Sequence, residues 1–189
     1  MLVNFNSLRI VTLSVLLLFC GSLSTADAGS HDTLFALINE RLSYMEQVAL
    51  YKNYNKLAVE DLERERLVID NSKRSAARLG LDSESTETFF AAQIAVAKAI
   101  QYRHMADWLS MPATGQPPDL TTRIRPALTE LGDQIIDNLA TLLHSGESIG
   151  EQHRQAFYTT ISVRHVEESD KALLFDSLVK VNTRARDTQ

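Results

Sequence analysis

Two cations on one predicted helix are the first residues that could do chemistry. Arg41 and Lys52 lie 11 positions apart, and at about 100° per residue this spacing returns to within roughly 20° of the same helix face. That face borders an apolar stripe, where burying a charge is expensive unless an anion meets it. The pair is therefore a candidate anion-binding site. Alternatively, both side chains extend to solvent or pair with Glu46 and Glu63, as long cationic side chains commonly do.

A charged segment and a lone amide are the other candidates. Residues 60–66 read Glu-Asp-Leu-Glu-Arg-Glu-Arg and open a predicted helix. Alone, this run would be interpreted as a solvated face with ion pairs between residues one turn apart. Gln101 follows on a helical stripe with Phe90, Ile94 and Trp108, where an amide usually satisfies a neighbouring helix. Taken together, however, these positions offer several cations, carboxylates and an amide to one small anionic ligand.

In their order and spacing, these residues resemble the active-site residues of the all-helical chorismate mutases. The match comprises Arg41, Lys52, Asp61, the Arg64-Glu65 pair and Gln101. The later segments 117–120 (Pro-Pro-Asp-Leu) and 124–126 (Ile-Arg-Pro) resemble the secreted subclass of that family. The resemblance covers most of the chain after residue 28. It implies an isomerase that rearranges chorismate, a small dianion, to prephenate in the shikimate pathway of aromatic amino acid biosynthesis.

The resemblance also implies a role for each matched residue. Arg41, Arg64 and Arg125 would bind the two carboxylates of chorismate, and Lys52 and Gln101 would donate hydrogen bonds to its ether oxygen. Glu65 would accept from the ring hydroxyl, and Asp61 would orient the pocket entrance. Two departures stand beside this assignment. Ala97 replaces a hydroxyl residue of the family, and Arg123 is the alternative to Arg125 if a gap in the proline-rich segment is placed differently. The matched residues are Arg41, Lys52, Asp61, Arg64, Glu65, Gln101 and Arg125.

The sequence predicts no cofactor and no metal. A pericyclic rearrangement needs no nucleophile, metal or proton transfer, so the enzyme would act by holding the substrate and stabilising charge on its ether oxygen. The histidines at positions 104, 144, 153 and 165 form no pair four residues apart and no His-Glu-x-x-His motif, which argues against a zinc site. The one cysteine, Cys20, falls within a predicted export signal.

Residues 1–28 are predicted to be that signal peptide. Arg9 precedes an apolar run at 10–23, and small residues at positions 26 and 28 form a cleavage pattern. Attachment of lipid at Cys20 is the alternative, although Phe19 stands where a small residue is usual. The run is shorter than the roughly 20 residues that a permanent membrane helix needs. We therefore expect a periplasmic or secreted protein with no membrane anchor after cleavage.

The elements that must position these residues are predicted to be helices throughout. Apolar residues recur at helical spacing and no alternating β-branched segment competes with them, so the class is all-α, a bundle of about six helices. We expect one domain over 29–189, with a catalytic half at 29–110, a proline-rich linker at 111–119 and a C-terminal helical half at 120–189. The predicted helices span 32–53, 60–79, 84–109, 120–142, 149–163 and 167–179.

The charge of the chain argues against one class of partner. The net charge of −5 is spread thinly and the basic clusters are short, so nucleic acid is not expected as a partner. The resemblance implies a homodimer. Two rival functions stay open: isochorismate pyruvate lyase, which shares the all-helical fold and the cationic pocket, and a non-catalytic periplasmic helical protein that binds a partner through an apolar groove.

Overall fold

The computed structural model describes residues 30–184, and these are helical with no strand among them. The predicted all-α class is therefore confirmed for this part of the chain, whereas the predicted signal peptide at 1–28 lies outside it. The elements are α1 (His31–Ser43), α2 (Met45–Tyr54), α3 (Leu62–Arg78), α4 (Ser83–Ser110), a π-helical turn η1 (Leu120–Ile124), α5 (Arg125–His144), a 3-10 turn η2 (Glu151–His153), α6 (Arg154–Thr160) and α7 (Glu168–Leu178). No helix of residues 30–184 is long and apolar enough to cross a membrane.

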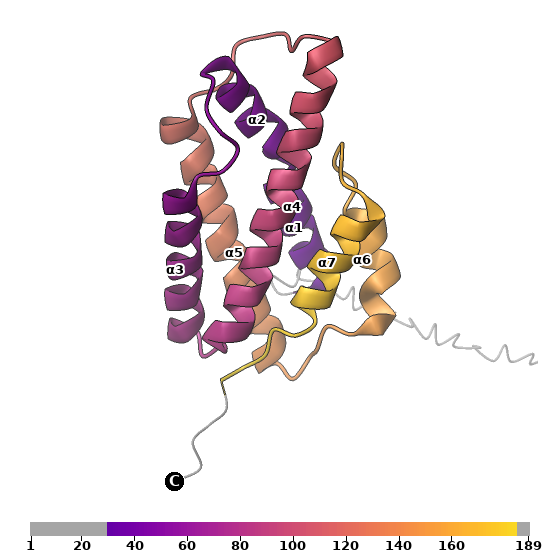
Figure 1. Cartoon of the computed structure of the whole chain (residues 1–189). Coiled ribbons are helices and arrows are strands. Elements are labelled where there is room, and N and C mark those ends of the chain that lie inside the picture. Colours follow the sequence, from indigo (N-terminus) through magenta and orange to yellow (C-terminus); the bar gives the residue numbers. More distant parts are fainter. Residues whose placement is uncertain (1–29, 185–189) are drawn as a thin grey trace, which may run out of the picture.

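The long helix α4 is the centre of the bundle (Figure 1). It packs against α2, α3 and α7, while α5 packs against α1 and α3. The short helix α6 closes the other side by contacting α1 and α7. Fully buried phenylalanines join these layers: the ring of Phe157 lies 5.1 Å from that of Phe35 and 5.3 Å from that of Phe175. The pocket described below lies among α1, α2, α3, α4, η1 and α5, and no residue of α6 or α7 lines it.

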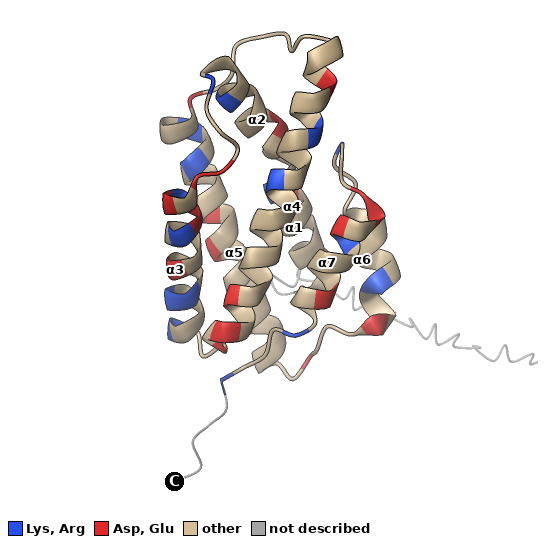
Figure 2. Ribbon diagram, viewed as in Figure 1, with Lys and Arg blue, Asp and Glu red and all other residues tan. Residues whose placement is uncertain are grey.

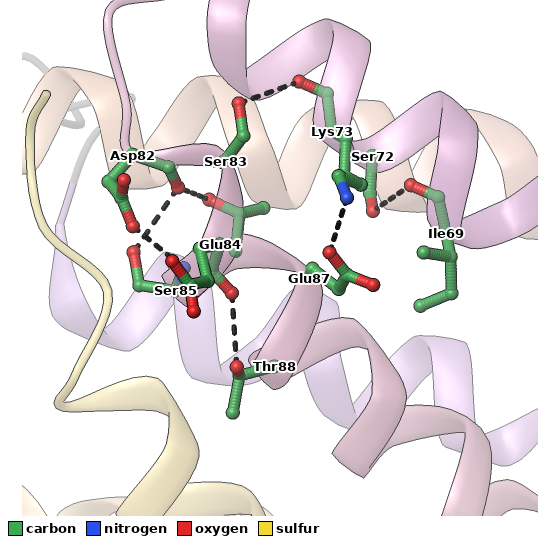
Figure 3. A network of polar contacts seen from close by, with 10 residues as sticks. Ile69, Ser72, Lys73, Asp82, Ser83, Glu84, Ser85, Glu87 and Thr88 are labelled. Atoms are coloured by element: carbon green, nitrogen blue, oxygen red, sulfur yellow. Dashed lines mark hydrogen bonds and ion pairs between the residues drawn. The ribbon is translucent and has the colours of Figure 1, made fainter.

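A sharp reversal at residues 79–82 sets α3 and α4 side by side. At the end of α3 the Leu81 N–H bonds the Ala76 carbonyl at 2.9 Å and the Gly80 N–H bonds the Ala77 carbonyl at 3.4 Å, which is a Schellman motif. Gly80 takes the left-handed φ of +72° that this motif needs. The Asp82 carboxylate then accepts the Ser85 N–H at 2.7 Å and caps α4 (Figure 3). Gly80 thus follows the end of α3, and Asp82 is the N-cap residue of α4.

The predicted helix at 32–53 is wrong at one point, because the structure divides it into α1 and α2 at Tyr44. The hydroxyl of Ser43 donates to the Glu40 carbonyl at 2.6 Å, which is the carbonyl that the Tyr44 N–H would otherwise use. The Tyr44 N–H turns to the Leu42 carbonyl instead. A serine that bonds its own backbone often bends a helix, and within residues 30–184 the break at Tyr44 gives one more α-helix than the bundle of about six that was predicted.

Two other predicted boundaries are also corrected. The predicted helix at 149–163 contains only η2 and α6, because beyond Thr160 the chain extends and the Ser162 N–H bonds the Asn39 side chain of α1 at 3.0 Å. The predicted helix from residue 120 opens with the π-helical turn η1. Pro126 stands at the start of α5, where the missing proline N–H removes no helical hydrogen bond.

Candidate active site

One pocket brings together the seven residues matched to the predicted active site. It has an empty volume of about 930 Å³, including the part open to solvent, and lies among α1, α2, α3, α4, η1 and α5. Arg125 lies in its wall, whereas Arg123 is exposed and does not line it. The predicted residues in the wall are Arg41, Lys52, Asp61, Arg64, Glu65, Ala97, Gln101 and Arg125.

Arg41 projects from α1 and is only 5% exposed. Its Nε and Nη1 atoms have no hydrogen-bond partner among residues 30–184, and its guanidinium lies 6.0 Å from the centre of the Phe90 ring. Burial, and secondarily the nearby Arg64, lower the pKa of Arg41 to about 10. The group is still a cation at neutral pH, and two of its donors are free to meet an anion.

Lys52 and Arg64 place two more cations on neighbouring walls. Lys52 is 7% exposed and its ammonium donates to the Val59 carbonyl, while burial lowers its pKa against the opposing effect of Asp61. Arg64 donates from Nη2 to the Thr129 hydroxyl on α5 at 3.1 Å. Burial, followed by the charge of Arg125, lowers the pKa of Arg64. Both shifts show cations held where positive charge is unfavourable.

Asp61 lines the pocket, and its carboxylate has two partners. Its Oδ1 accepts the Arg64 N–H at 3.1 Å and caps the start of α3, an arrangement that satisfies one of the free N–H groups of a helix end. Its Oδ2 pairs with the Arg125 guanidinium of α5 at 2.7 Å. The same carboxylate therefore fixes the first turn of α3 and joins that turn to the C-terminal half of the chain.

Glu65 and Gln101 complete the predicted set. Glu65 pairs with Lys98 of α4 at 3.0 Å. The Gln101 amide nitrogen donates to the Ala97 carbonyl at 3.0 Å and contacts the Met45 sulfur at 3.6 Å, and its oxygen has no hydrogen-bond partner among the described residues. Sequence reasoning missed Lys98, although its position one turn before Gln101 was a signal that the two side chains share a helix face.

The charges of the pocket do not cancel. Its wall contains five cations, with Lys98 beside the four predicted ones, and three carboxylates, those of Asp61, Glu65 and Asp133. Arg125 and Lys98 are paired with carboxylates. Within residues 30–184, no carboxylate lies within ion-pair distance of Arg41, Lys52 or Arg64. Figure 2 shows that Lys or Arg residues (blue) and Asp or Glu residues (red) follow one another along the α3 ribbon. An acidic chain thus contains a local positive field suited to a small dianion.

Comparison with known proteins identifies the family. A family model described as chorismate mutase type II matches residues 31–102, from α1 into α4. A monofunctional chorismate mutase of Enterobacter agglomerans is 35% identical over 163 residues, which are 86% of this chain and 88% of the relative. The chain belongs to the chorismate mutase family. A secreted chorismate mutase of Yersinia pestis is 38% identical over 148 residues, or 78% of this chain and 80% of the relative.

Solved structures of other family members have the same all-helical fold. The crystal structure of the secreted Yersinia pestis chorismate mutase superimposes with a TM-score of 0.74 at 37% identity, covering 80% of this chain and 97% of that one. A chorismate mutase from Burkholderia thailandensis superimposes with a TM-score of 0.65 at 28% identity, covering 78% of this chain and 95% of that one. The chorismate mutase fold predicted from the sequence is therefore confirmed.

Proposed function

We propose that this chain is an exported chorismate mutase that rearranges chorismate to prephenate. The observation that carries the proposal is the partly enclosed pocket in which Arg41, Lys52 and Arg64 are cations with no carboxylate partner in the described part of the chain. In the reaction the ether C–O bond breaks as a new C–C bond forms within the same molecule. No group is transferred, so the protein contributes geometry and electrostatic stabilisation.

Binding of the two substrate carboxylates falls to Arg41, Arg64 and Arg125. A planar guanidinium can donate two parallel hydrogen bonds to a carboxylate, which a lysine ammonium cannot. The three groups project from α1, α3 and α5, so a bound dianion would be fixed from three directions. Holding the flexible enolpyruvyl arm over the ring removes rotational freedom before the bond forms, and such restraint is worth up to about 7–11 kcal/mol in well-oriented reactions.

Lys52 and Gln101 are the proposed donors to the ether oxygen as it becomes negative. Both are buried, at 7% and 4% exposure, and a donor in a site that excludes water stabilises developing charge more than it would in solvent. The Gln101 amide has two N–H groups, and because one of them already bonds the Ala97 carbonyl, the other is the donor available to the substrate oxygen. Glu65 would accept from the ring hydroxyl, and Asp61 would orient the entrance through Arg125.

Export and assembly are part of the same proposal. The pattern of residues 1–28 is that of a signal peptide, and the relative from Yersinia pestis is named a secreted chorismate mutase. We propose that the protein acts in the periplasm or outside the cell, as a single domain over 29–189, and forms a homodimer in which each chain carries one complete site.

Loss of chorismate absorbance on addition of the purified exported protein tests the activity. Lys52→Ala should lower kcat/KM by about 10²-fold or more, as removal of one donor to a developing oxyanion does. Lys180→Ala is the control, because Lys180 is exposed and remote from the pocket wall. Equal activity of the two variants would contradict the role of Lys52. A wild-type protein that leaves chorismate unchanged would contradict the enzyme itself and favour the non-catalytic binding protein.

The same preparation decides between the two pericyclic activities. A lyase would release pyruvate from isochorismate, whereas the proposed mutase acts faster on chorismate. Measuring both substrates at equal enzyme concentration gives two values of kcat/KM. If the value for isochorismate is the larger, the protein is an isochorismate pyruvate lyase of the same fold.

A further inference from the structure

Lys98 is a pocket residue to which the predicted active-site set assigns no role. It projects from α4 between Ala97 and Gln101 and lines the pocket with both of them. Its side chain is 28% exposed, and that of its partner Glu65 is 22% exposed. The Lys98 ammonium donates to Glu65 Oε2 at 3.0 Å across the gap between α4 and α3.

With this contact, both carboxylate oxygens of Glu65 accept a hydrogen bond. The other oxygen of that carboxylate, Oε1, accepts the Asp61 N–H at 3.3 Å. Asp61 is itself fixed by its cap on Arg64 and by its pair with Arg125. The Glu65 carboxylate is therefore oriented by two groups. One is the backbone N–H of Asp61 at the start of α3, and the other is the ammonium of Lys98 on α4.

Lys98 also neutralises the negative charge of Glu65. A carboxylate in a pocket that must receive a dianion repels that dianion, and the repulsion is stronger in a partly buried site than in water. Lys98 cancels this charge locally. Because its ammonium is already engaged by Glu65, it differs from Arg41 and Lys52, neither of which has a carboxylate partner among the described residues.

We propose that Lys98 is a positioning residue that orients the Glu65 carboxylate and neutralises its charge. The pocket can then bind a dianion while Glu65 stays in place as a hydrogen-bond acceptor. The proposal rests on the proposed mutase function. Lys98 acts through Glu65 and does not itself bind the substrate. Its removal should therefore weaken substrate binding through repulsion and slow the bound reaction through a misplaced Glu65.

The chain contains a matched ion pair that serves as control. Lys73 of α3 pairs with Glu87 of α4 (Figure 3), so it joins the same two helices with the same residue types. Neither residue lines the active-site pocket. Both side chains are 41% exposed. Lys73→Met thus reports what the loss of an α3–α4 lysine–glutamate pair does to the fold alone.

The test compares kcat, KM and thermal unfolding of Lys98→Met, Lys98→Arg and Lys73→Met. Lys98→Met should lower kcat/KM about tenfold, as expected for a lost charge-assisted hydrogen bond, with KM raised and kcat reduced. Lys98→Arg should restore most of the activity, and Lys73→Met should stay within about twofold of wild type. If Lys98→Met and Lys73→Met have equal kcat/KM, the contact is merely structural and the proposal is overturned.

A second comparison in the Glu65→Gln background separates action through Glu65 from direct substrate contact. With no carboxylate to hold or neutralise, adding Lys98→Met should change kcat/KM by less than about twofold, since coupled residues are not additive. A full tenfold loss in that background would mean that Lys98 contacts the substrate, and would overturn the proposal. An inactive wild-type protein would overturn the proposed mutase function as well, so the two failures are distinguishable.

Discussion

At the scale of single residues, the pocket is built from charged groups held in unfavourable surroundings. Arg41 is the extreme case, since its Nε and Nη1 have no hydrogen-bond partner between residues 30 and 184 and burial lowers its pKa to about 10. A buried donor without a partner costs roughly 1–3 kcal/mol, and more when it is charged. The fold tolerates this cost at the position where a carboxylate of the proposed substrate would supply the missing hydrogen bonds.

His104 is a second buried polar residue, and it predicts how stability depends on pH. It is 1% exposed, its Nδ1 has no partner among the described residues, and its ring lies 4.5 Å from that of His165. Burial lowers the pKa of His104 below the ordinary 6.5, against Glu46 and Asp107, which raise it, and with His165 and Arg164, which lower it further. The folded protein therefore binds this proton less readily than the unfolded chain.

The direction of the pH dependence follows from the linkage between proton binding and folding. Above pH 6.5 both states are neutral at His104, and as the pH falls below that value the unfolded chain gains a proton first, so stability decreases. His104→Gln should therefore show a smaller drop in Tm between pH 7.5 and pH 5.5 than wild type. His144→Gln is the control, because His144 is exposed. Equal drops in wild type and His104→Gln would contradict the prediction.

At the scale of elements, the reversal between α3 and α4 sets the register of two pocket walls. The left-handed Gly80 allows the reversal, and a Cβ added there would lie 3.3 Å from His144 Nε2. The Glu65–Lys98 contact lies on these same two helices. A shift at the reversal would therefore move Lys98 and Gln101 relative to Glu65.

Gly80→Ala should destabilise the protein by about 1–2 kcal/mol, because a residue with a Cβ in the left-handed region is strained. Urea unfolding followed by circular dichroism measures the change. Gly80→Asn is the matched variant, since asparagine tolerates this conformation better, and it should lose less. An alanine variant as stable as wild type would mean that the reversal adopts another backbone without penalty.

Sequence periodicity predicted the helices because each buries one apolar face, and it placed Arg41, Lys52 and Gln101 correctly on inward faces. It could not predict the division at Tyr44, which depends on the orientation of one hydroxyl, that of Ser43. The end of α6 depends on a contact with Asn39, more than a hundred positions away. The helical spacing of Lys98 and Gln101 could have placed Lys98 in the pocket, but its pairing with Glu65 could not be predicted, because Glu65 lies on another helix.

At the scale of the whole molecule, both predicted halves of the chain contribute to one pocket. Arg125, Leu128 and Thr129 come from the second half, and the remaining cations come from the first. Since all seven predicted site residues lie in the pocket of one chain, the protein should not need a partner's residues for activity even as the proposed homodimer.

Mixing two inactive variants tests this completeness. Arg41→Ala and Arg125→Ala each remove one proposed carboxylate ligand, on opposite halves of the chain. If every site belongs to one chain, a mixture unfolded and refolded together should show only the sum of the two residual activities. Recovery toward a quarter or more of wild-type activity would indicate sites shared between chains. Wild type refolded in parallel controls for recovery of the native fold.

The two interactions of the Asp61 carboxylate limit which substitutions the protein can accept during evolution. Its carboxylate caps α3 and also holds Arg125, so any replacement alters helix stability and pocket geometry in a single step. Natural or laboratory selection for altered substrate preference would meet a trade-off at this position. Substitutions that reshape the entrance would survive only in backgrounds already stabilised elsewhere.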